Sequence, residues 1–256
     1  VSLLVVDEAH RAVGDYAYVF LAEQYRQKAK HEKILALTAS PGTDKETVQT
    51  VLENLGIERL EYRTITSKDV VNYTQETEIK WEEIEIKDRL QKIISFLKSA
   101  YKQKLLQVKE KGFLSTNLSS LNKTKLLLLQ RELHSLASKN DVNIELLQSI
   151  SLLAQSLKIQ HALELAETQT LFALHEYLFG LLSSARTTKT KAVKNLVKDP
   201  LFLSALSLTR DLLKEGQEHP KVDALLVNIK NIVGKRSDAK IILFTQFRDT
   251  AIALEK

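Results

Sequence analysis

Two acids and a histidine close the first apolar run of this chain. The run Leu3–Val6 has the length and composition of a short buried strand, and Asp7, Glu8 and His10 follow it directly. In an open α/β sheet, ligands bind outside the carboxyl ends of the strands. A carboxylate there can hold Mg²⁺ on a nucleotide, while a second acid positions or deprotonates an attacking water. These residues therefore predict phosphoryl chemistry at a sheet edge.

A second apolar run ends in hydroxyl residues about thirty positions later. Ile34–Leu37 reads as a strand, Thr38 and Ser40 follow it, and Pro41-Gly42 then forces a turn. Hydroxyls before Pro-Gly are also common in ordinary loops, where they stabilise the turn. Thr38 and Ser40 are therefore either turn residues or partners of the acidic segment on the neighbouring strand.

The two segments together resemble motifs II and III of the superfamily 2 helicases of the DEAH type. The amino-acid sequences of Asp7–Tyr18 and Thr38–Gly42 are similar to those of archaeal Hef helicases and their Fanconi-anaemia M relatives. They are more distantly similar to those of RIG-I-like and Dicer helicases. Near the other end, Ala239–Thr250 is similar to motif IV, which opens the second RecA-like lobe in that family.

The resemblance implies a role for each motif residue. Asp7 would hold Mg²⁺ through a water, and Glu8 would activate the water that attacks the γ-phosphate of ATP. His10 would bond toward motif III, where Thr38 and Ser40 would couple the nucleotide state to the nucleic-acid side. An acid at this place could otherwise serve only as a helix N-cap.

The phosphate-cradling P-loop, Gly-x-x-x-x-Gly-Lys-Ser/Thr, does not occur in the sequence. In the family it lies upstream of motif II, and the arginine-bearing motif VI lies downstream of motif IV. We therefore expect this chain to be an internal piece of a longer polypeptide, inactive toward ATP on its own.

The first part of the chain alternates strand and helix patterns, which is typical of a parallel sheet. Besides the two motif strands, we expect helices over 16–30 and 43–55, the latter beginning at Thr43 or Asp44 and closed by Gly56. Leu60–Ile65 and Trp81–Ile86 read as two further short strands.

The middle of the chain reads as several long packed helices. Residues 87–199 contain no proline and two glycines, and leucines recur at helical spacing. Asp141 or Asn143 would begin the longest helix. Further helices are expected over 201–215 and from His219-Pro220 to Val233, before a strand at Ile241–Phe244.

The fold class expected is α/β, with parts of two RecA-like P-loop NTPase lobes flanking a large all-helical insert. We expect residues 1–80 to belong to the first lobe and 87–212 to form a thumb-like helical domain. Residues 81–86 and 213–256 would then begin the second lobe.

Positive charge concentrates in the helical middle. Residues 85–215 carry 20 lysines and arginines against 12 acids, although the net charge of the whole chain is only +5. This favours a polyanion partner, while a solvated lysine-rich face is the ordinary alternative. One run contains no acid and, at its spacing, would lie near one helix face; it comprises Arg186, Lys189, Lys191, Lys194 and Lys198.

The same run contains no aromatic residue, so contacts there would be sequence-independent and directed at phosphates. After the expected motif IV strand, Gln246 and Arg248 could contact a phosphate or the partner lobe. Arg248 could equally be a solvated charge.

Composition excludes several other classes. The chain of 256 residues has no cysteine, which excludes disulfides and thiolate metal sites and fits the cytoplasm, or the nucleus in a eukaryote. No apolar run is long enough to span a membrane. The six histidines form no cluster with metal-ligand spacing.

We therefore interpret the chain as the central part of an ATP-dependent DNA helicase of Hef type, using ATP and Mg²⁺ and acting on forked or branched DNA. Two alternatives stay open: a double-stranded-RNA-dependent ATPase of RIG-I or Dicer type, and a non-catalytic helical nucleic-acid-binding module. The sequence does not determine the oligomeric state.

Overall fold

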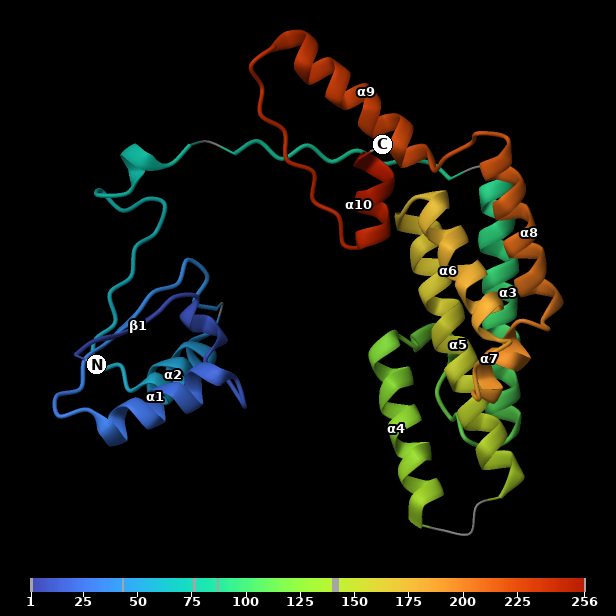
Figure 1. Ribbon diagram of the computed structural model, residues 1–256, viewed down its shortest axis with the longest axis horizontal. Helices are drawn as coiled ribbons and strands as arrows, with labels where there is room; N and C mark the ends of the chain where they lie inside the picture. Colours follow the sequence, from blue (N-terminus) through green and yellow to red (C-terminus); the bar gives the residue numbers. More distant parts are fainter. Residues whose placement is uncertain (1, 43, 76, 87, 140–142, 256) are drawn as a thin grey trace. The chain divides into compact units, whose positions relative to one another are not determined.

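The computed structural model describes residues 2–42, 44–75, 77–86, 88–139 and 143–255. The chain divides into two compact units, Val1–Lys80 and Trp81–Lys256 (Figure 1). Most described residues are helical, and the strands are confined to the first unit.

The first unit is a small βαβα structure. Its strands are β1 (Leu4–Val6) and β2 (Ile34–Ala36), which pair in parallel with Val5 opposite Leu35. Its helices are α1 (Ala17–Lys28) and α2 (Lys45–Leu55), with short 3₁₀ turns at Ala9–Arg11 and Val71–Tyr73.

The core of this unit lies on one face of the sheet. Val6 packs with Ala22 of α1 and with Val51 and Leu55 of α2. On the other face of the sheet, Val5 is 52% exposed and Leu35 is 46% exposed. Within the described residues the sheet is therefore covered on one side only.

Helix α2 begins and ends as the sequence predicts. Asp44 accepts a hydrogen bond from the Thr47 N–H at 2.7 Å, and Gly56 closes the helix in the left-handed region at φ 66°. Thr43, the other expected start, lies outside the described residues.

The second unit is a helical bundle followed by two further helices. Its elements are α3 (Asp88–Glu110), α4 (Lys123–Lys139), α5 (Ile144–Thr168), α6 (Leu171–Ser184), α7 (Lys191–Leu196), α8 (Pro200–Lys214), α9 (Pro220–Lys235) and α10 (Arg248–Glu255), with a 3₁₀ turn at Leu118–Ser120. Helix α3 packs along α5 and α8, α4 packs on α5, and α6 packs on α8.

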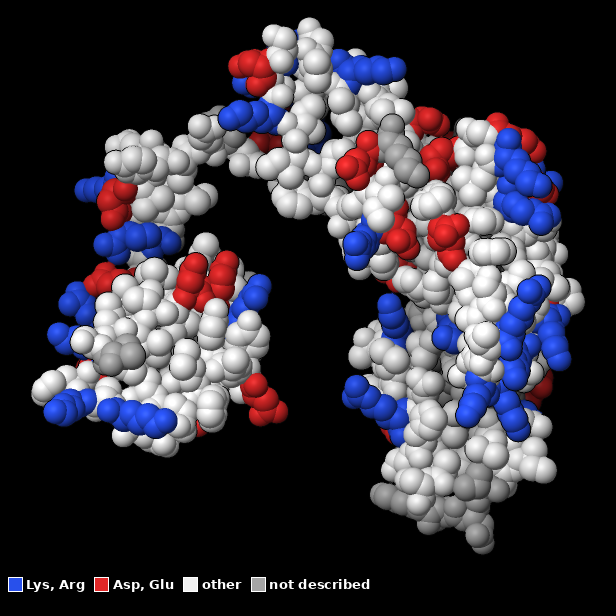
Figure 2. Space-filling model, viewed as in Figure 1, with Lys and Arg blue, Asp and Glu red and all other residues white. Residues whose placement is uncertain are grey.

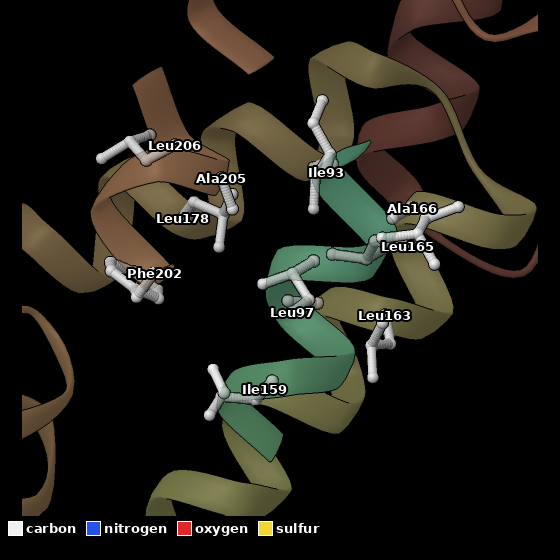
Figure 3. Close-up of a cluster of buried hydrophobic side chains, with 14 of the residues drawn as sticks. Ile93, Leu97, Ile159, Leu163, Leu165, Ala166, Leu178, Phe202, Ala205 and Leu206 are labelled. Carbon is white, nitrogen blue, oxygen red and sulfur yellow. The ribbon is translucent and has the colours of Figure 1, made fainter. Parts of the chain in front are cut away.

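The bundle has two apolar cores along α3 and α5. The larger joins the first half of α3 to α5, α6 and α8, and Ile93, Leu97 and Phe202 are fully buried in it (Figure 3). The smaller joins the end of α3 to α4 and to the start of α5, around Leu105 and Leu126.

Side-chain caps fix where these helices begin. Asn143 accepts from the Leu146 N–H at 2.7 Å, and Thr170 accepts from the Ala173 N–H at 3.1 Å. Asp199 caps α8 while Pro200 occupies its first turn. Asn143 therefore starts the longest helix, as predicted; Asp141, the alternative start, lies outside the described residues.

Three expected strands are wrong. The structure has no strand over Leu60–Ile65, Trp81–Ile86 or Ile241–Phe244, and the described residues form one sheet, of β1 and β2. Tyr62, Trp81 and Phe244 are 75%, 91% and 94% exposed. A strand needs a second strand to satisfy its backbone, and among the described residues no strand pairs with these segments.

His219 caps α9 from a fully buried position. Its Nδ1 accepts from the Lys221 N–H at 3.1 Å. Burial, with a smaller contribution from the charge of Lys221, lowers the pKa of His219 to about 4.

Acid should therefore destabilise this unit through His219. The folded-state pKa lies below the unfolded value of 6.5, so stability is lost as the pH falls from about 6.5 toward 4. We expect a loss of about 2 kcal/mol between pH 7 and pH 4.5 from this group alone. His219→Asn keeps a capping side chain but does not titrate, so urea unfolding should show a flatter pH dependence. A variant with the parent's pH dependence would contradict this account.

Candidate active site and nucleic-acid surface

The ends of β1 and β2 bring the two predicted motifs to the same sheet edge. The parallel pairing continues past both strands, because the Leu37 N–H donates to the Val6 carbonyl at 2.8 Å and the Ala9 N–H donates to the Leu37 carbonyl at 2.9 Å. Residues 7–10 and 38–40 therefore lie beside each other at the carboxyl end of the sheet.

The His10 ring is the contact point between the two segments. Its Nδ1 lies 2.9 Å from Thr38 Oγ1, 3.3 Å from Glu8 Oε2 and 3.5 Å from Ser40 Oγ. The Ser40 N–H in turn donates to Thr38 Oγ1 at 3.1 Å. A change in the position of Glu8 can thus reach Thr38 and Ser40 through one imidazole nitrogen.

Glu8 has an unusual backbone conformation. Its φ of 51° and ψ of 45° lie in the left-handed region, and among the described residues Asp88 is the other non-glycine with positive φ. This conformation costs a non-glycine residue about 1 kcal/mol or more, and such strain is concentrated at functional sites. The half-exposed carboxylate of Glu8 faces solvent and the His10 ring.

Asp7 and Glu8 offer the oxygen ligands that Mg²⁺ prefers. Asp7 Oδ1 accepts from the Glu8 N–H at 2.8 Å, and both side chains are exposed. Among the described residues no group of three or more His, Cys, Asp or Glu side chains could hold a metal. The pair therefore fits Mg²⁺ as proteins commonly bind it, with one or two carboxylates and the remaining ligands from water and phosphate.

Gln246 and Arg248 flank an anchored aromatic residue. Both are exposed, whereas Phe247 packs against the larger bundle core, with its ring centre 5.4 Å from that of His161. The Thr250 hydroxyl donates to Gln169 Oε1 at 2.7 Å and ties the start of α10 to the end of α5. The bundle therefore holds the segment that carries Gln246 and Arg248, although the strand expected before it is absent.

Gln246 also lines a cavity of about 300 Å³ between α10 and the start of α9. Thr168, Lys221 and Phe244 contribute to its wall. The sequence prediction did not include Phe247 among the site residues. The sequence feature that could have identified it is the position of an apolar residue between the polar residues Gln246 and Arg248.

The basic run does not lie on one helix face, which corrects the prediction. Helix α6 ends at Ser184, and α7 holds only Lys191 and Lys194 of the run. The other three members lie in the flanking turns, and all five side chains are exposed; the three are Arg186, Lys189 and Lys198. Figure 2 shows Lys and Arg gathered over the part of the bundle that contains α7.

Within the described ranges, no helix is long and apolar enough to cross a membrane.

Comparison with known proteins places these features in one family. Residues 89–215 match the family model for the helical bundle of an ATP-dependent RNA helicase. A protein of Methanocaldococcus jannaschii, provisionally named an ATP-dependent RNA helicase, is 36% identical over 97% of this chain and 30% of its own length. The ATP-dependent DNA helicase MPH1 of Pyricularia oryzae is 32% identical over 98% of this chain and 24% of its own length.

The crystal structure of the Pyrococcus furiosus Hef helicase domain superposes with a TM-score of 0.64 at 36% identity, over 99% of this chain and 53% of that one. The chain belongs to the Hef-type superfamily 2 helicases. The resemblance that Asp7–His10, Thr38–Gly42 and Ala239–Thr250 indicate is thereby confirmed at the level of the family. This Hef-type chain spans less than a third of the length of the two relatives named above.

Proposed function

We propose that this chain is the central part of an ATP-dependent DNA helicase that acts on forked or branched DNA. The observation that carries the proposal is the bond from His10 to Thr38 at 2.9 Å, beside a strained Glu8. It joins the two segments in which the sequence predicts nucleotide chemistry. The relatives named as ATP-dependent helicases support the use of ATP.

In this proposal each acid has one task. Asp7 would hold Mg²⁺ through a water, and the ion would supply charge neutralisation at the phosphates of ATP. Glu8 orients the attacking water and accepts its proton. The left-handed backbone at Glu8 sets the direction of its carboxylate relative to Asp7.

His10, Thr38 and Ser40 couple that site to the nucleic acid. When Glu8 changes partners during hydrolysis, the 3.3 Å contact to His10 changes with it. The imidazole then shifts its bond to Thr38, whose hydroxyl also holds the Ser40 backbone.

We propose a three-part organisation with two RecA-like lobes. Residues 1–80 would belong to the first lobe, 87–212 to the thumb-like insert, and 81–86 with 213–256 to the second lobe. The bare sheet face at Val5 and Leu35 supports this, because a RecA-like lobe covers both faces of its sheet. The exposed Phe244 supports it likewise, since a lobe would pair and bury that segment.

The nucleic acid would contact two surfaces of the second unit. The basic run around α7 would bind phosphates of a duplex arm, and Gln246 with Arg248 would contact a phosphate or the partner lobe. The MPH1 relatives are named DNA helicases, which supports DNA, whereas the Methanocaldococcus jannaschii relative is named for RNA.

On its own, the 256-residue chain should not hydrolyse ATP above background, because no P-loop occurs in its sequence. The full-length protein should separate the strands of a forked duplex in the presence of ATP and Mg²⁺, and should not do so with a non-hydrolysable ATP analogue. A gel assay of strand release tests this. Equal release with the analogue, or none with ATP, would contradict the proposal.

A further inference from the structure

Helix α6 exposes a large aromatic side chain beside the basic run. Leu178 points into the larger bundle core and is fully buried, as Figure 3 shows. The next residue, Phe179, is rotated by about 100° around the helix and is 50% exposed. Phe179 is not among the residues of the apolar cores of the described chain.

The ring of Phe179 is held in one orientation by a neighbour. His175 lies one turn earlier, and its ring stacks on Phe179 with centres 5.8 Å apart and planes 8° apart. The His175 Nδ1 is fixed in turn by Glu176 Oε1 at 3.2 Å. A planar aromatic surface is therefore preorganised on an exposed helix face.

The surface next to this ring is open. Gly180 lies within α6, where a glycine costs about 1 kcal/mol relative to alanine. A Cβ added at Gly180 would meet no atom within 4 Å, so packing within the described chain does not require the glycine. The surface at Gly180 is therefore open to an incoming group.

Arg186 shares a cavity with the same ring. Phe179 and Arg186 line a cavity of about 230 Å³, together with Leu182 and Ser183. Arg186 is also the first member of the basic run that continues through Lys189 to α7. An aromatic ring, a hydroxyl and a guanidinium around one cavity are groups that can contact the base, sugar and phosphate of one nucleotide.

We propose that Phe179 is a stacking platform for an unpaired base, with Arg186 binding the adjacent phosphate. The occupant is a single-stranded segment of the nucleic acid, such as the unpaired arm of a fork. This inference rests on the proposed function, and it adds a contact that recognises the single strand to the phosphate contacts of the basic run. The positive charge that continues from Arg186 favours a nucleic acid over an apolar protein segment.

The test uses the full-length protein and two DNA probes of equal duplex length, one forked with single-stranded arms and one blunt. Phe179→Ala should weaken binding to the fork by about 5- to 100-fold, since stacking on an aromatic is worth about 1–3 kcal/mol per base. Binding to the blunt duplex should change by less than about twofold. Phe179→Tyr should restore fork binding, because it keeps the ring.

The salt dependence of DNA binding distinguishes the role of Phe179 from that of Arg186. Phe179→Ala should leave the slope of log affinity against log salt unchanged, whereas Arg186→Gln should lower it by about one. A fluorescent base analogue in the single-stranded arm should be quenched by the parent and by Phe179→Tyr, but not by Phe179→Ala. Leu203→Ala, at a residue 40% exposed on α8, is the matched control and should change nothing.

Unchanged fork binding by Phe179→Ala, or an equal loss on the blunt duplex, would overturn the inference while leaving the proposed function standing. A parent protein that binds neither DNA would overturn the proposed function and this inference with it.

Discussion

Replacing Glu8 by Gln in the full-length protein should reduce ATP hydrolysis by at least about 10²- to 10⁴-fold, the range expected when a general base is removed. Gln preserves the size of the side chain and can adopt the same strained backbone conformation as Glu8. It cannot accept a proton from the attacking water. ATP binding should persist, because the Mg²⁺ role assigned to Asp7 is not altered.

Steady-state phosphate release at saturating DNA measures the effect. Glu23→Gln, at an exposed glutamate of α1 in the same unit, is the matched control and should retain parental turnover. Near-normal hydrolysis by the Glu8→Gln protein would show that another group activates the water.

Reversing the charge of Lys191, Lys194 and Lys198 together to Glu should weaken DNA binding by on the order of a hundredfold at low salt. A lysine–phosphate pair is worth about 1 kcal/mol in water, and three such contacts would be lost. The slope of log affinity against log salt should become shallower by about 2 to 3, because fewer counterions are displaced. All sequences should be affected alike, and forked DNA most strongly.

The same reversal at three exposed lysines of the first unit controls for net charge; these are Lys28, Lys30 and Lys33. Anisotropy titrations at several salt concentrations compare the two triple variants. If the Lys191, Lys194 and Lys198 variant bound forked and linear DNA with parental affinity and slope, the basic run would be an ordinary solvated surface.

The sequence predicts the helices of this chain well, because their signals are local. Asp44, Asn143 and Pro220 stand where helices begin, and Gly56 stands where one ends. The meeting of the two motif segments is also predictable, since parallel strands end at the same sheet edge.

The strands at Leu60–Ile65, Trp81–Ile86 and Ile241–Phe244 could not be predicted reliably from the same kind of pattern. A helix satisfies its own backbone, whereas a strand must pair with another strand that lies far away in sequence, and no strand pairs with these segments within the described chain. The prediction that the basic run lies on one helix face was wrong for a local reason. Helix α6 ends before the run, and the next helix, α7, begins only at Lys191.

The exposure of Phe179 could not be predicted from the sequence of its helix. Helix α6 is apolar on most sides, so periodicity alone does not separate the buried Leu178 from the exposed Phe179. Only packing against α3, α5 and α8 decides which residue faces the core.

The most direct test of the central claim is the rate of ATP hydrolysis by the full-length protein as forked DNA is added. The account predicts strong stimulation by forked DNA, at lower concentration than by linear duplex DNA or by double-stranded RNA. Stimulation by double-stranded RNA with none by forked DNA would contradict it and favour an RNA-dependent ATPase. No hydrolysis with any nucleic acid would leave the chain a binding module without the chemistry assigned to Asp7 and Glu8.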